Sequence, residues 1–592
     1  MFQSFDVTAR PEVAPPRVAK LRAWLAAHEL DAFLVPRADA HQGEYVAPCD
    51  ERLAWITGFT GSAGLAVIGR DRAAVFTDGR YTVQIRAQTD PATFEIRKWP
   101  GETVAAWLGE RLPKGARVGF DPMLHTVREI EKLRAVDGVE LVPAQNGVDA
   151  VWDDRPPRPR EPVTAYPTEL AGKGDETKRA EIAAALRDAG AKSAVVTQPD
   201  AICWLLNIRG SDIARSPLVL AFAVVHADGS VELFSDPAKF DGLGPDPAIT
   251  LHEWDAFADR LRALDGPVLI DPATAPWAVA DALGDRALQG TDPIALPKAR
   301  KSEAEIAATT EAHLRDGAAM VRFLRWLDEA RPDAATEIDV VRQLEWFRRD
   351  TNALREISFE TIAGSGPHGA IVHYRVNKET NRKLDTDSVL LVDSGGQYID
   401  GTTDITRTVP LGFPPADIAH AFTRVLQGMI AVSRARFPVG VAGAHLDALA
   451  RAPLWAEHRD YDHGTGHGVG VYLGVHEGPA RISRVSTIPL EAGMILSNEP
   501  GYYREGEYGI RIENLIVVRP AEPLPGGDPE REMLRFDTLT WVPIDRRLIV
   551  AALLSPDERT WLDAYHAGVL ERLAPRLAGP DLDWLTRMCA PI

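Results

Sequence analysis

Two aspartates near the middle of the chain are spaced so that they could share a cation. Asp393 ends the apolar run VLLVD, and Asp404 follows eleven residues later in DGTTDITRT, beyond a turn at Gly395-Gly396. A hairpin at that turn would bring the two carboxylates together. Unpaired carboxylates at close range repel each other, and one takes up a proton unless a cation lies between them. The pair alone leaves two interpretations open, a metal site or ordinary turn acids.

Three further residues extend the aspartate pair. His463 and His467, in HGTGHGVG, have the spacing of helical zinc ligands, but four glycines within eight residues disfavour a helix. We therefore expect His467 on a strand or loop. Glu499 precedes Pro500, which favours an extended conformation before it. Glu513 lies in GIRIEN, a predicted apolar strand where an unpaired carboxylate would be costly to bury.

These residues form a set of four carboxylates and one imidazole. Such hard, oxygen-rich ligands suit manganese or another first-row divalent ion better than a thiolate site would. For Glu513 considered alone, an acid at a strand edge is an equal alternative. The whole set predicts a cation site built from strands and loops.

The predicted site lies among short apolar strands separated by glycine-rich turns. From about Phe359 onward these strands include VHYRV, SVLLVDSGG, MILSNEPGYY and IRIENLIVV. Ahead of them, Ser302 and Glu305 form a capping box, which predicts a long helix through Leu327. A second capping box at Ser555 predicts a helix near the end of the chain.

Two similar segments precede that region. Each begins with a helix and a buried strand: RVAKLRAWLAAHEL and DAFLVP in the first, ETKRAEIAAALRDAG and AKSAVVTQ in the second. Each then places a tryptophan, Trp55 or Trp204, six residues before the glycine of a Gly-Ser pair. Both continue to a strand that ends in AVFTD or ELFSD. We interpret the two segments as a duplicated α/β domain, with chance similarity as the alternative.

The length of 592 residues leads us to expect about three or four domains. Four prolines from Pro156 to Pro162 favour an extended connector between the two similar segments. A second boundary is expected at 298–301, ahead of the long helix. The predicted domains are 1–160, 161–300 and 301–592: two similar α/β domains, then a domain of mixed strands and helices that carries the cation site.

The composition limits the classes of partner and compartment. With 45% hydrophobic residues and a formal charge of −19, the chain has a globular balance and no surface for nucleic acid. Its three cysteines are far apart and form no CxxC pair, which fits a reducing cytosol. No export signal is visible, and no apolar run approaches the ~20 residues of a membrane span. We therefore expect a cytoplasmic protein without a membrane partner.

The motifs, in this order, resemble the creatinase, prolidase and methionine aminopeptidase superfamily, whose catalytic fold is called pita-bread. The closest likeness is to three-domain aminopeptidase P, and it extends over nearly the whole chain. The matching motifs are EYVAPCDERLAWITGFTGSAG, WLLNIRGSD, GPHGAIVHY, VDSGGQYIDGTTDITRT, HGTGHGVG, GVHEGP, NEPGYY and IRIEN. The resemblance implies two creatinase-like N-terminal α/β domains, a pita-bread catalytic domain with a C-terminal extension, and a homodimer.

The resemblance also implies a role for each residue of the cation site. Asp393 would bind one metal ion, and Asp404 and Glu513 would bridge two. His467 and Glu499 would complete the coordination. The expected cofactors are two divalent cations, Mn²⁺ first, with Co²⁺ or Zn²⁺ as alternatives.

Five other residues match positions around the metal site of the family. His373 and His476 match its two active-site histidines that bind no metal, with a structural hydrogen bond as the alternative role. His463 matches a histidine near the substrate, Arg511 an arginine that supports the site, and Tyr503 a wall of the proline pocket. Human-like members have a proline soon after the HY pair, whereas this chain has HYRVNKETN, which leaves the subsite preference open.

The implied reaction is removal of the first residue from peptides with proline in second position. Two cations about 3.5–4 Å apart can bridge a water and supply hydroxide at neutral pH. That hydroxide would attack the carbonyl before proline while His373 or His476 stabilises the oxyanion. Glu499 would carry the water's proton to the proline nitrogen.

Three alternatives share the fold. A prolidase would use the same ligands on dipeptides, but two α/β segments ahead of the catalytic domain favour the three-domain aminopeptidase. Creatinase is disfavoured because it does not retain the metal ligands, whereas all five are present here. A non-catalytic pita-bread binding protein is the alternative of another class, and the intact ligand set and acidic charge disfavour it.

Overall fold

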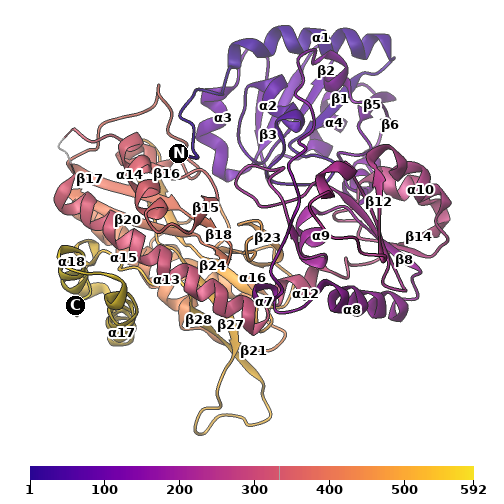
Figure 1. The fold of residues 1–592 in the computed structure, drawn as a ribbon. Coiled ribbons are helices and arrows are strands. Elements are labelled where there is room, and N and C mark those ends of the chain that lie inside the picture. Colours follow the sequence, from indigo (N-terminus) through magenta and orange to yellow (C-terminus); the bar gives the residue numbers. More distant parts are fainter. Residues whose placement is uncertain (332–333) are drawn as a thin grey trace. The chain divides into compact units, whose positions relative to one another are not determined.

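The computed structural model describes residues 1–331 and 334–592. The chain divides into two compact units: an N-terminal unit, Thr8–Lys298, and a C-terminal unit, Ala299–Ile592 with Met1–Val7 (Figure 1). The first seven residues thus belong with the C-terminal unit, whereas the sequence assigned them to the first domain. Phe5 explains the difference, because its ring is buried in the hydrophobic core of the C-terminal unit.

The first half of the N-terminal unit is a six-stranded mixed sheet with helices around it. The strand order is β4-β3-β2-β1-β5-β6, and β1 runs antiparallel to β2 and parallel to β5. The strands are β1 (Ala32–Pro36), β2 (Leu65–Gly69), β3 (Ala73–Thr77), β4 (Glu95–Lys98), β5 (Ala116–Phe120) and β6 (Val139–Pro143). The helices are α1 (Ala14–Ala27), α2 (Arg52–Thr57), α3 (Thr82–Gln88), α4 (Val104–Arg111), α5 (Val127–Arg134) and α6 (Gly147–Val151).

The second half repeats this architecture. Its sheet has the order β12-β11-β10-β8-β13-β14, so β8 takes the central place of β1. The strands are β8 (Ser193–Val196), β10 (Phe222–His226), β11 (Val231–Ser235), β12 (Ile249–Glu253), β13 (Val268–Ile270) and β14 (Ala287–Gln289), and β7 (Thr164–Ala165) pairs separately with β9 (Ile208–Arg209). The helices are α7 (Thr168–Ala171), α8 (Asp175–Asp188), α9 (Pro199–Leu205), α10 (Phe257–Ala263), α11 (Trp277–Leu283) and α12 (Ala295–Ala299).

Equivalent segments of the two halves bond to each other reciprocally. The amide of Arg128 donates to the carbonyl of Pro272, and the amide of Ala278 donates to the carbonyl of Pro122, both at 2.9 Å. The strand ends AVFTD and ELFSD also act alike, because each final aspartate caps the turn that follows it. The repeated sheet order and these reciprocal bonds agree with the predicted duplication.

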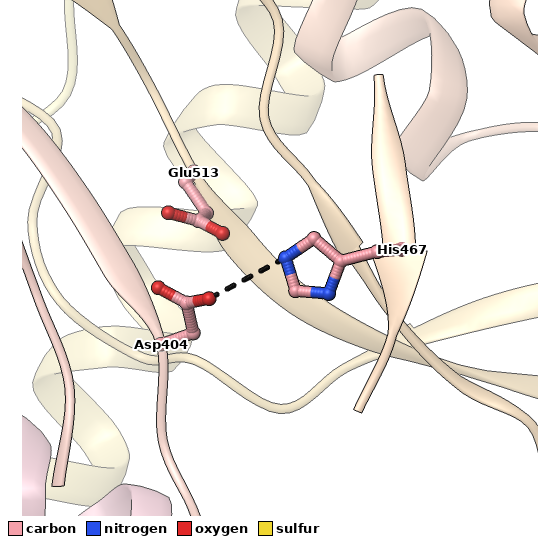
Figure 2. Close-up of side chains that lie close together, drawn as sticks. All are labelled: Asp404, His467 and Glu513. Atoms are coloured by element: carbon pink, nitrogen blue, oxygen red, sulfur yellow. Dashed lines mark ion pairs between the residues drawn. The ribbon is translucent and has the colours of Figure 1, made fainter. Parts of the chain in front are cut away.

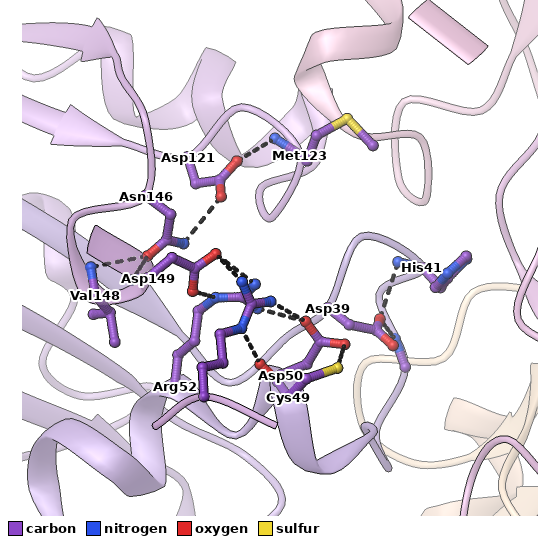
Figure 3. Close-up of polar contacts among 12 residues, drawn as sticks. Asp39, His41, Cys49, Asp50, Arg52, Asp121, Met123, Asn146, Val148 and Asp149 are labelled. Carbon is purple, nitrogen blue, oxygen red and sulfur yellow. Dashed lines mark hydrogen bonds and ion pairs between the residues drawn. The ribbon is translucent and has the colours of Figure 1, made fainter. Parts of the chain in front are cut away.

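A polar network covers the carboxyl ends of the parallel strands in the first half (Figure 3). Arg52 donates to both oxygens of Asp149, at 2.6 and 3.0 Å, and to Asp50 at 2.8 Å. Asp121 follows β5 and accepts a 2.9 Å bond from the Asn146 amide. Ligands often bind at this edge of a parallel sheet, but here Arg52 pairs with Asp50 and Asp149, and Asp121 bonds to a neutral amide.

The C-terminal unit begins where the sequence placed its first capping box. The Ser302 hydroxyl accepts from the amide of Glu305, and α13 (Glu303–Arg325) follows. The α-helix ends two residues before the predicted Leu327, and a π-helical turn, Trp326–Ala330, follows it. Near the end of the chain, α17 (Pro556–Leu573) starts at the second predicted capping box, at Ser555.

Between these helices, the described residues form three small sheets and one six-stranded sheet. Their orders are β15-β18-β19, β16-β17-β20, β21-β28-β27-β24-β22-β23 and β25-β26. The strands are β15 (Leu354–Ile357), β16 (Ile362–Ser365), β17 (Asp387–Ser394), β18 (Gly396–Tyr398), β19 (Gly401–Thr402), β20 (Ile405–Gly412), β21 (Arg436–Pro438), β22 (Gly466–Gly468), β23 (Glu477–Ile482), β24 (Ile495–Asn498), β25 (Gly501–Arg504), β26 (Tyr508–Arg511), β27 (Asn514–Pro520) and β28 (Met533–Thr538). The other helices are α14 (Glu337–Arg349), α15 (Ala416–Ser433), α16 (Gly443–Trp455) and α18 (Pro580–Met588).

One predicted strand is wrong. The segment VHYRV, residues 372–376, forms a turn and irregular chain. Val372, Tyr374 and Val376 are buried, as alternate residues of a strand would be. The backbone nevertheless bonds locally, because the amide of Tyr374 donates to the carbonyl of Ile371.

A buried ion pair joins the first two helices of the C-terminal unit to its sheets. Arg348 on α14 is fully buried, and its Nε and Nη2 donate to the two oxygens of Asp316 on α13 at 2.7 and 3.0 Å. Asp316 also accepts from the hydroxyls of Tyr398, at 2.6 Å, and Thr403, at 3.1 Å. The helices thereby fix the short connection from β17 to β20.

In the described part of the chain, every helix is too short or too polar to cross a bilayer.

Replacing Asp316 by alanine should destabilise the C-terminal unit by about 3–5 kcal/mol, because it leaves the Arg348 guanidinium buried without its counter-ion. Urea unfolding followed by tryptophan fluorescence would measure the loss. Glu507→Ala is the control, since its ion pair with Arg504 is about half exposed and should contribute no more than about 1 kcal/mol. Equal unfolding midpoints for the two variants would contradict the structural role of Asp316.

Candidate metal centre

The two aspartates are joined by a hairpin, as predicted, but its turn lies at Ile399 and Asp400 and not at Gly395-Gly396, because Gly396 begins strand β18. Asp393 lies on β17 opposite Thr406 of β20, and Asp404 comes directly before Ile405, the first residue of β20. The short strands β18 and β19 lie between the two aspartates in the sequence. The hairpin places both carboxylates at the same end of the β17–β20 pair.

Asp404, His467 and Glu513 converge, as Figure 2 shows. One ligand atom from each of the three lies within 4.8 Å of the others. Nε2 of His467 is 3.5 Å from Asp404 Oδ2 and 3.4 Å from Glu499 Oε1. Three carboxylates of the predicted set, those of Asp404, Glu499 and Glu513, therefore lie close to the imidazole of His467.

His467 lies on the short strand β22, as the glycine-rich motif predicts. Its Nδ1 is 2.9 Å from the carbonyl oxygen of Gly468, an atom that only accepts hydrogen bonds. The proton therefore belongs on Nδ1, and Nε2 faces the carboxylates. This arrangement, with the second nitrogen bound to a carbonyl, is the one that metal-binding histidines adopt.

The two glutamates are held by backbone and hydroxyl contacts at the ends of strands. Glu499 follows β24, and its amide donates to the carbonyl of Thr465 at 2.8 Å. Glu513 lies in the break between β26 and β27, not inside one continuous strand as predicted. The chain changes partners there, because β26 pairs with β25 and β27 with β24. Glu513 Oε2 accepts from the Thr406 hydroxyl at 2.7 Å.

The electrostatics of this cluster fit cations. Burial, followed by repulsion from Asp393, raises the pKa of Asp404 well above its ordinary value, and burial with repulsion from Asp404 does the same to the pKa of Glu513. Among the described residues, none donates a hydrogen bond to the buried Oδ1 atoms of Asp393 and Asp404. Buried carboxylate oxygens without donors are the groups that a divalent cation satisfies.

Arg511 connects the cluster to the predicted substrate residues. It is 1% exposed, and it donates to Asp393 Oδ2 at 2.6 Å and to the Tyr503 hydroxyl at 2.7 Å. The same hydroxyl is 2.9 Å from His463 Nε2. Burial raises the pKa of Tyr503 to about 12, so its hydroxyl stays neutral at physiological pH. The structure thus brings Arg511, Tyr503 and His463 together beside Asp393.

The two remaining histidines are placed differently. The His476 ring meets the His467 ring edge to face, with centroids 4.3 Å apart, so it lies against the cluster. His373 is half-buried in the turn before Tyr374. Arg511 ties this turn to the site, because its Nη1 donates to the carbonyl of Val372 at 3.4 Å.

The sequence analysis did not identify several residues that lie around the site. Thr406 bonds to Glu513, and Thr408 accepts from the amide of Arg511. The alternation of side chains along a strand could have indicated both threonines, because Asp404, Thr406 and Thr408 are two residues apart and share one face of the strand. Arg348 gave no such signal, since a basic residue in the last turn of an amphipathic helix is ordinarily exposed.

Family models match nearly the whole chain. The model of metallopeptidase family M24 matches residues 307–520, and the C-terminal region of that peptidase matches 532–592. Two models of the creatinase/prolidase N-terminal domain match residues 17–151 and 154–305.

Similar proteins share this full-length arrangement. A probable Xaa-Pro aminopeptidase P of Laccaria bicolor is 40% identical over 97% of this chain and 93% of its own length. Aminopeptidase P2 of Arabidopsis thaliana is 39% identical over 95% of this chain and 86% of its own length. The crystal structure of an X-prolyl aminopeptidase from Caenorhabditis elegans, described as cytosolic with a di-nuclear active site, aligns with a TM-score of 0.93 at 34% identity, covering 98% of this chain and 100% of that one.

Asp404→Asn should stabilise the metal-free protein while weakening its stabilisation by manganese. With a raised pKa, folded Asp404 retains a proton that the unfolded chain has released above about pH 4. The stability of the metal-free wild type therefore falls as the pH rises toward that raised pKa. Asparagine stays neutral and avoids this loss, so its gain in melting temperature should be larger at about pH 8 than at about pH 5.

Differential scanning fluorimetry after chelation, with and without added manganese, measures both effects. Asp387→Asn is the matched control, because Asp387 is an exposed aspartate at the start of β17, the strand that pairs with β20. The assignment of Asp404 to a cation site fails if manganese stabilises the Asp404→Asn protein as strongly as the wild type.

Proposed function

This chain belongs to metallopeptidase family M24, and we propose that it is an aminopeptidase that hydrolyses the bond before proline in second position of a peptide. The observation that carries the proposal is the convergence of Asp404, His467 and Glu513. No group among the described residues donates a hydrogen bond to the buried Oδ1 atoms of Asp404 and the nearby Asp393. The relatives named aminopeptidase P, similar over nearly the full length, support the substrate class.

We propose that two divalent cations occupy the site. Their ligands would be Asp393, Asp404, His467, Glu499 and Glu513, with Asp404 and Glu513 shared between the ions. Manganese suits this oxygen-rich set, with cobalt and zinc as alternatives. Bound cations would supply an activated water and polarise the scissile carbonyl.

The protein's own residues then carry the proton and orient the substrate. Glu499, whose Oε1 lies 3.4 Å from His467 Nε2, would take the proton of the attacking water and deliver it to the proline nitrogen. His476, packed on His467, would donate to the carbonyl oxygen as negative charge develops there. His373 is the second candidate for this role.

Proline selectivity would come from the shape of the neighbouring pocket. A proline ring fixes φ and its nitrogen carries no hydrogen, so a rigid wall can select it. We propose Tyr503 as that wall, with His463 beside it. Arg511 holds the Tyr503 hydroxyl in place at 2.7 Å, which keeps the wall fixed relative to Asp393.

We also propose three domains, 1–160, 161–300 and 301–592, and a cytoplasmic location. The two similar sheets of the N-terminal unit support the domain division. Cys49, Cys203 and Cys589 are all free thiols and buried, as suits a reducing compartment. Cell fractionation would test the location, and recovery in a secreted fraction would contradict it.

A homodimer is the oligomeric state that we propose. Exposed apolar side chains gather at the end of α16 and on the segment 484–488: Trp455 is 44% exposed and Val485 81%. The guanidinium of Arg484 lies 5.8 Å from the centre of the Trp455 ring, so the two segments are neighbours. Exposed apolar patches mark association surfaces.

Val485→Asp should therefore convert a dimer into a monomer, because a carboxylate would lose its hydration at the interface. Sedimentation velocity would measure the change. A wild-type chain that sediments as a monomer would contradict the proposal.

With manganese restored, the protein should release the first residue from Xaa-Pro-Xaa tripeptides and longer peptides. Replacing the proline by alanine should remove most turnover, because the peptide would lose the ring that fills the pocket. Mass spectrometry of the products over a peptide panel measures both results. Equal cleavage of the proline and alanine peptides would indicate a broader aminopeptidase instead.

The same peptide panel distinguishes the proposed aminopeptidase from a prolidase, the nearest alternative. A prolidase would prefer the Xaa-Pro dipeptide to the tripeptide, whereas we expect the tripeptide to be preferred. An inert protein that still binds manganese would identify a non-catalytic member of the fold.

A further inference from the structure

A short loop carries His476 to the candidate metal centre. Residues 470–476, called here the His476 loop, close on themselves through the amide of Gly470, which donates to the carbonyl of Gly474 at 3.0 Å. Val471, Leu473 and Val475 are buried. Tyr472 has a φ of +49°, a conformation that non-glycine residues adopt rarely and that the surroundings must enforce.

The middle of this loop is fixed by one buried amide side chain. Gln397, 1% exposed, donates from Nε2 to the carbonyl oxygen of Leu473 at 2.8 Å. Its Oε1 accepts from the hydroxyl of Thr402 at 2.8 Å. The Leu473 carbonyl only accepts, so the NH₂ group of the amide must face the loop, and the Thr402 hydroxyl holds the opposite, oxygen end of the amide.

Gln397 and Thr402 belong to the connection between the two aspartates. Gln397 is on β18 and Thr402 on β19, and they are opposite each other in the register of that pair. Asp393 precedes this pair in the sequence and Asp404 follows it. The side chains that fix the His476 loop therefore extend from the same hairpin that places the two aspartates.

The far end of the loop has its own anchor. Glu477, the residue after His476, forms a buried ion pair with Lys301, and both side chains are no more than 3% exposed. With Leu473 and Glu477 both held, the His476 ring has little freedom to leave its contact with His467.

We propose that Gln397 is a positioning residue that sets the place of His476 relative to the metal ligands. Without its NH₂ group, the Leu473 carbonyl keeps only the Thr402 hydroxyl, 3.4 Å away, as a donor among these side chains. A buried carbonyl that loses its donor drives local rearrangement. The proposal rests on the proposed function for its catalytic consequence and on geometry alone for its structural one.

Gln397→Leu should lower kcat by about tenfold or more, since displacements near 1 Å at a reacting group cost up to about a hundredfold. KM and the manganese content should stay within about twofold of wild type, because substrate and ions bind to other groups. Steady-state kinetics on an Xaa-Pro-Xaa peptide and metal analysis of the same samples give the three quantities.

Gln427→Leu is the matched control. Gln427 lies on α15, is 8% exposed and likewise donates to a backbone carbonyl, that of Leu553, at 3.0 Å. A merely structural amide should behave as Gln427 does, lowering thermal stability without a selective loss of kcat. An equal kcat for the two leucine variants would overturn the proposal.

A second pair of variants applies if Gln397→Leu fails to fold. Thr402→Ser keeps the hydroxyl that orients the Gln397 amide, and Thr402→Val removes it. The serine variant should keep kcat within about twofold of wild type and the valine variant should lose it, as in Gln397→Leu. Equal kcat values for serine and valine would contradict the role of the hydroxyl and of the amide it orients.

If the wild-type protein cleaves no peptide, the proposed function fails, and the crystal structure of Gln397→Leu decides the positioning claim. We expect the His476 ring to leave its edge-to-face contact with His467 while Asp404 and Glu513 stay in place. An unmoved His476 loop would overturn the claim independently of any activity.

Discussion

Mutual repulsion among buried carboxylates is the constraint on which the C-terminal unit depends. Asp404, Glu499 and Glu513 lie close to one imidazole. Burial raises the pKa values of all three, and neighbouring carboxylates raise those of Asp404 and Glu513 further. Ionised and unpaired, such a group would favour opening the structure. Divalent cations turn the same repulsion into coordination, because each carboxylate oxygen then faces positive charge.

The surrounding structure keeps the carboxylates in place against that repulsion. The Arg511 guanidinium neutralises Asp393 from outside the cluster. The buried pair of Asp316 and Arg348 holds the β17–β20 connection through Tyr398 and Thr403. This connection also reaches the His476 loop, so the ligands and the proposed oxyanion donor share one support. Such preorganisation is what a catalytic site requires, because a loosely held group loses most of its effect.

The sequence predicted what depends on local pattern and missed what depends on tertiary contact. Capping boxes located α13 and α17, and glycine content predicted a strand or loop, not a helix, for His467, which lies on β22. The apolar content of VHYRV suggested a strand, but a turn buries Val372, Tyr374 and Val376 equally well. The sequence also did not show that the chain passes from one sheet to another at Glu513. Gln397 bonds to Leu473, 76 residues away, and Arg348 bonds to Asp316, 32 residues away, and such pairings cannot be read from either segment alone. The ligand roles and domain bounds remain predictions.

The most direct test of the account is anomalous diffraction from crystals of the metal-stripped protein soaked in manganese. We predict two anomalous peaks per chain, enclosed by Asp393, Asp404, His467, Glu499 and Glu513, with Asp404 and Glu513 contacting both ions. A saturating soak that leaves these side chains without ions, or that places manganese only elsewhere, would contradict the account.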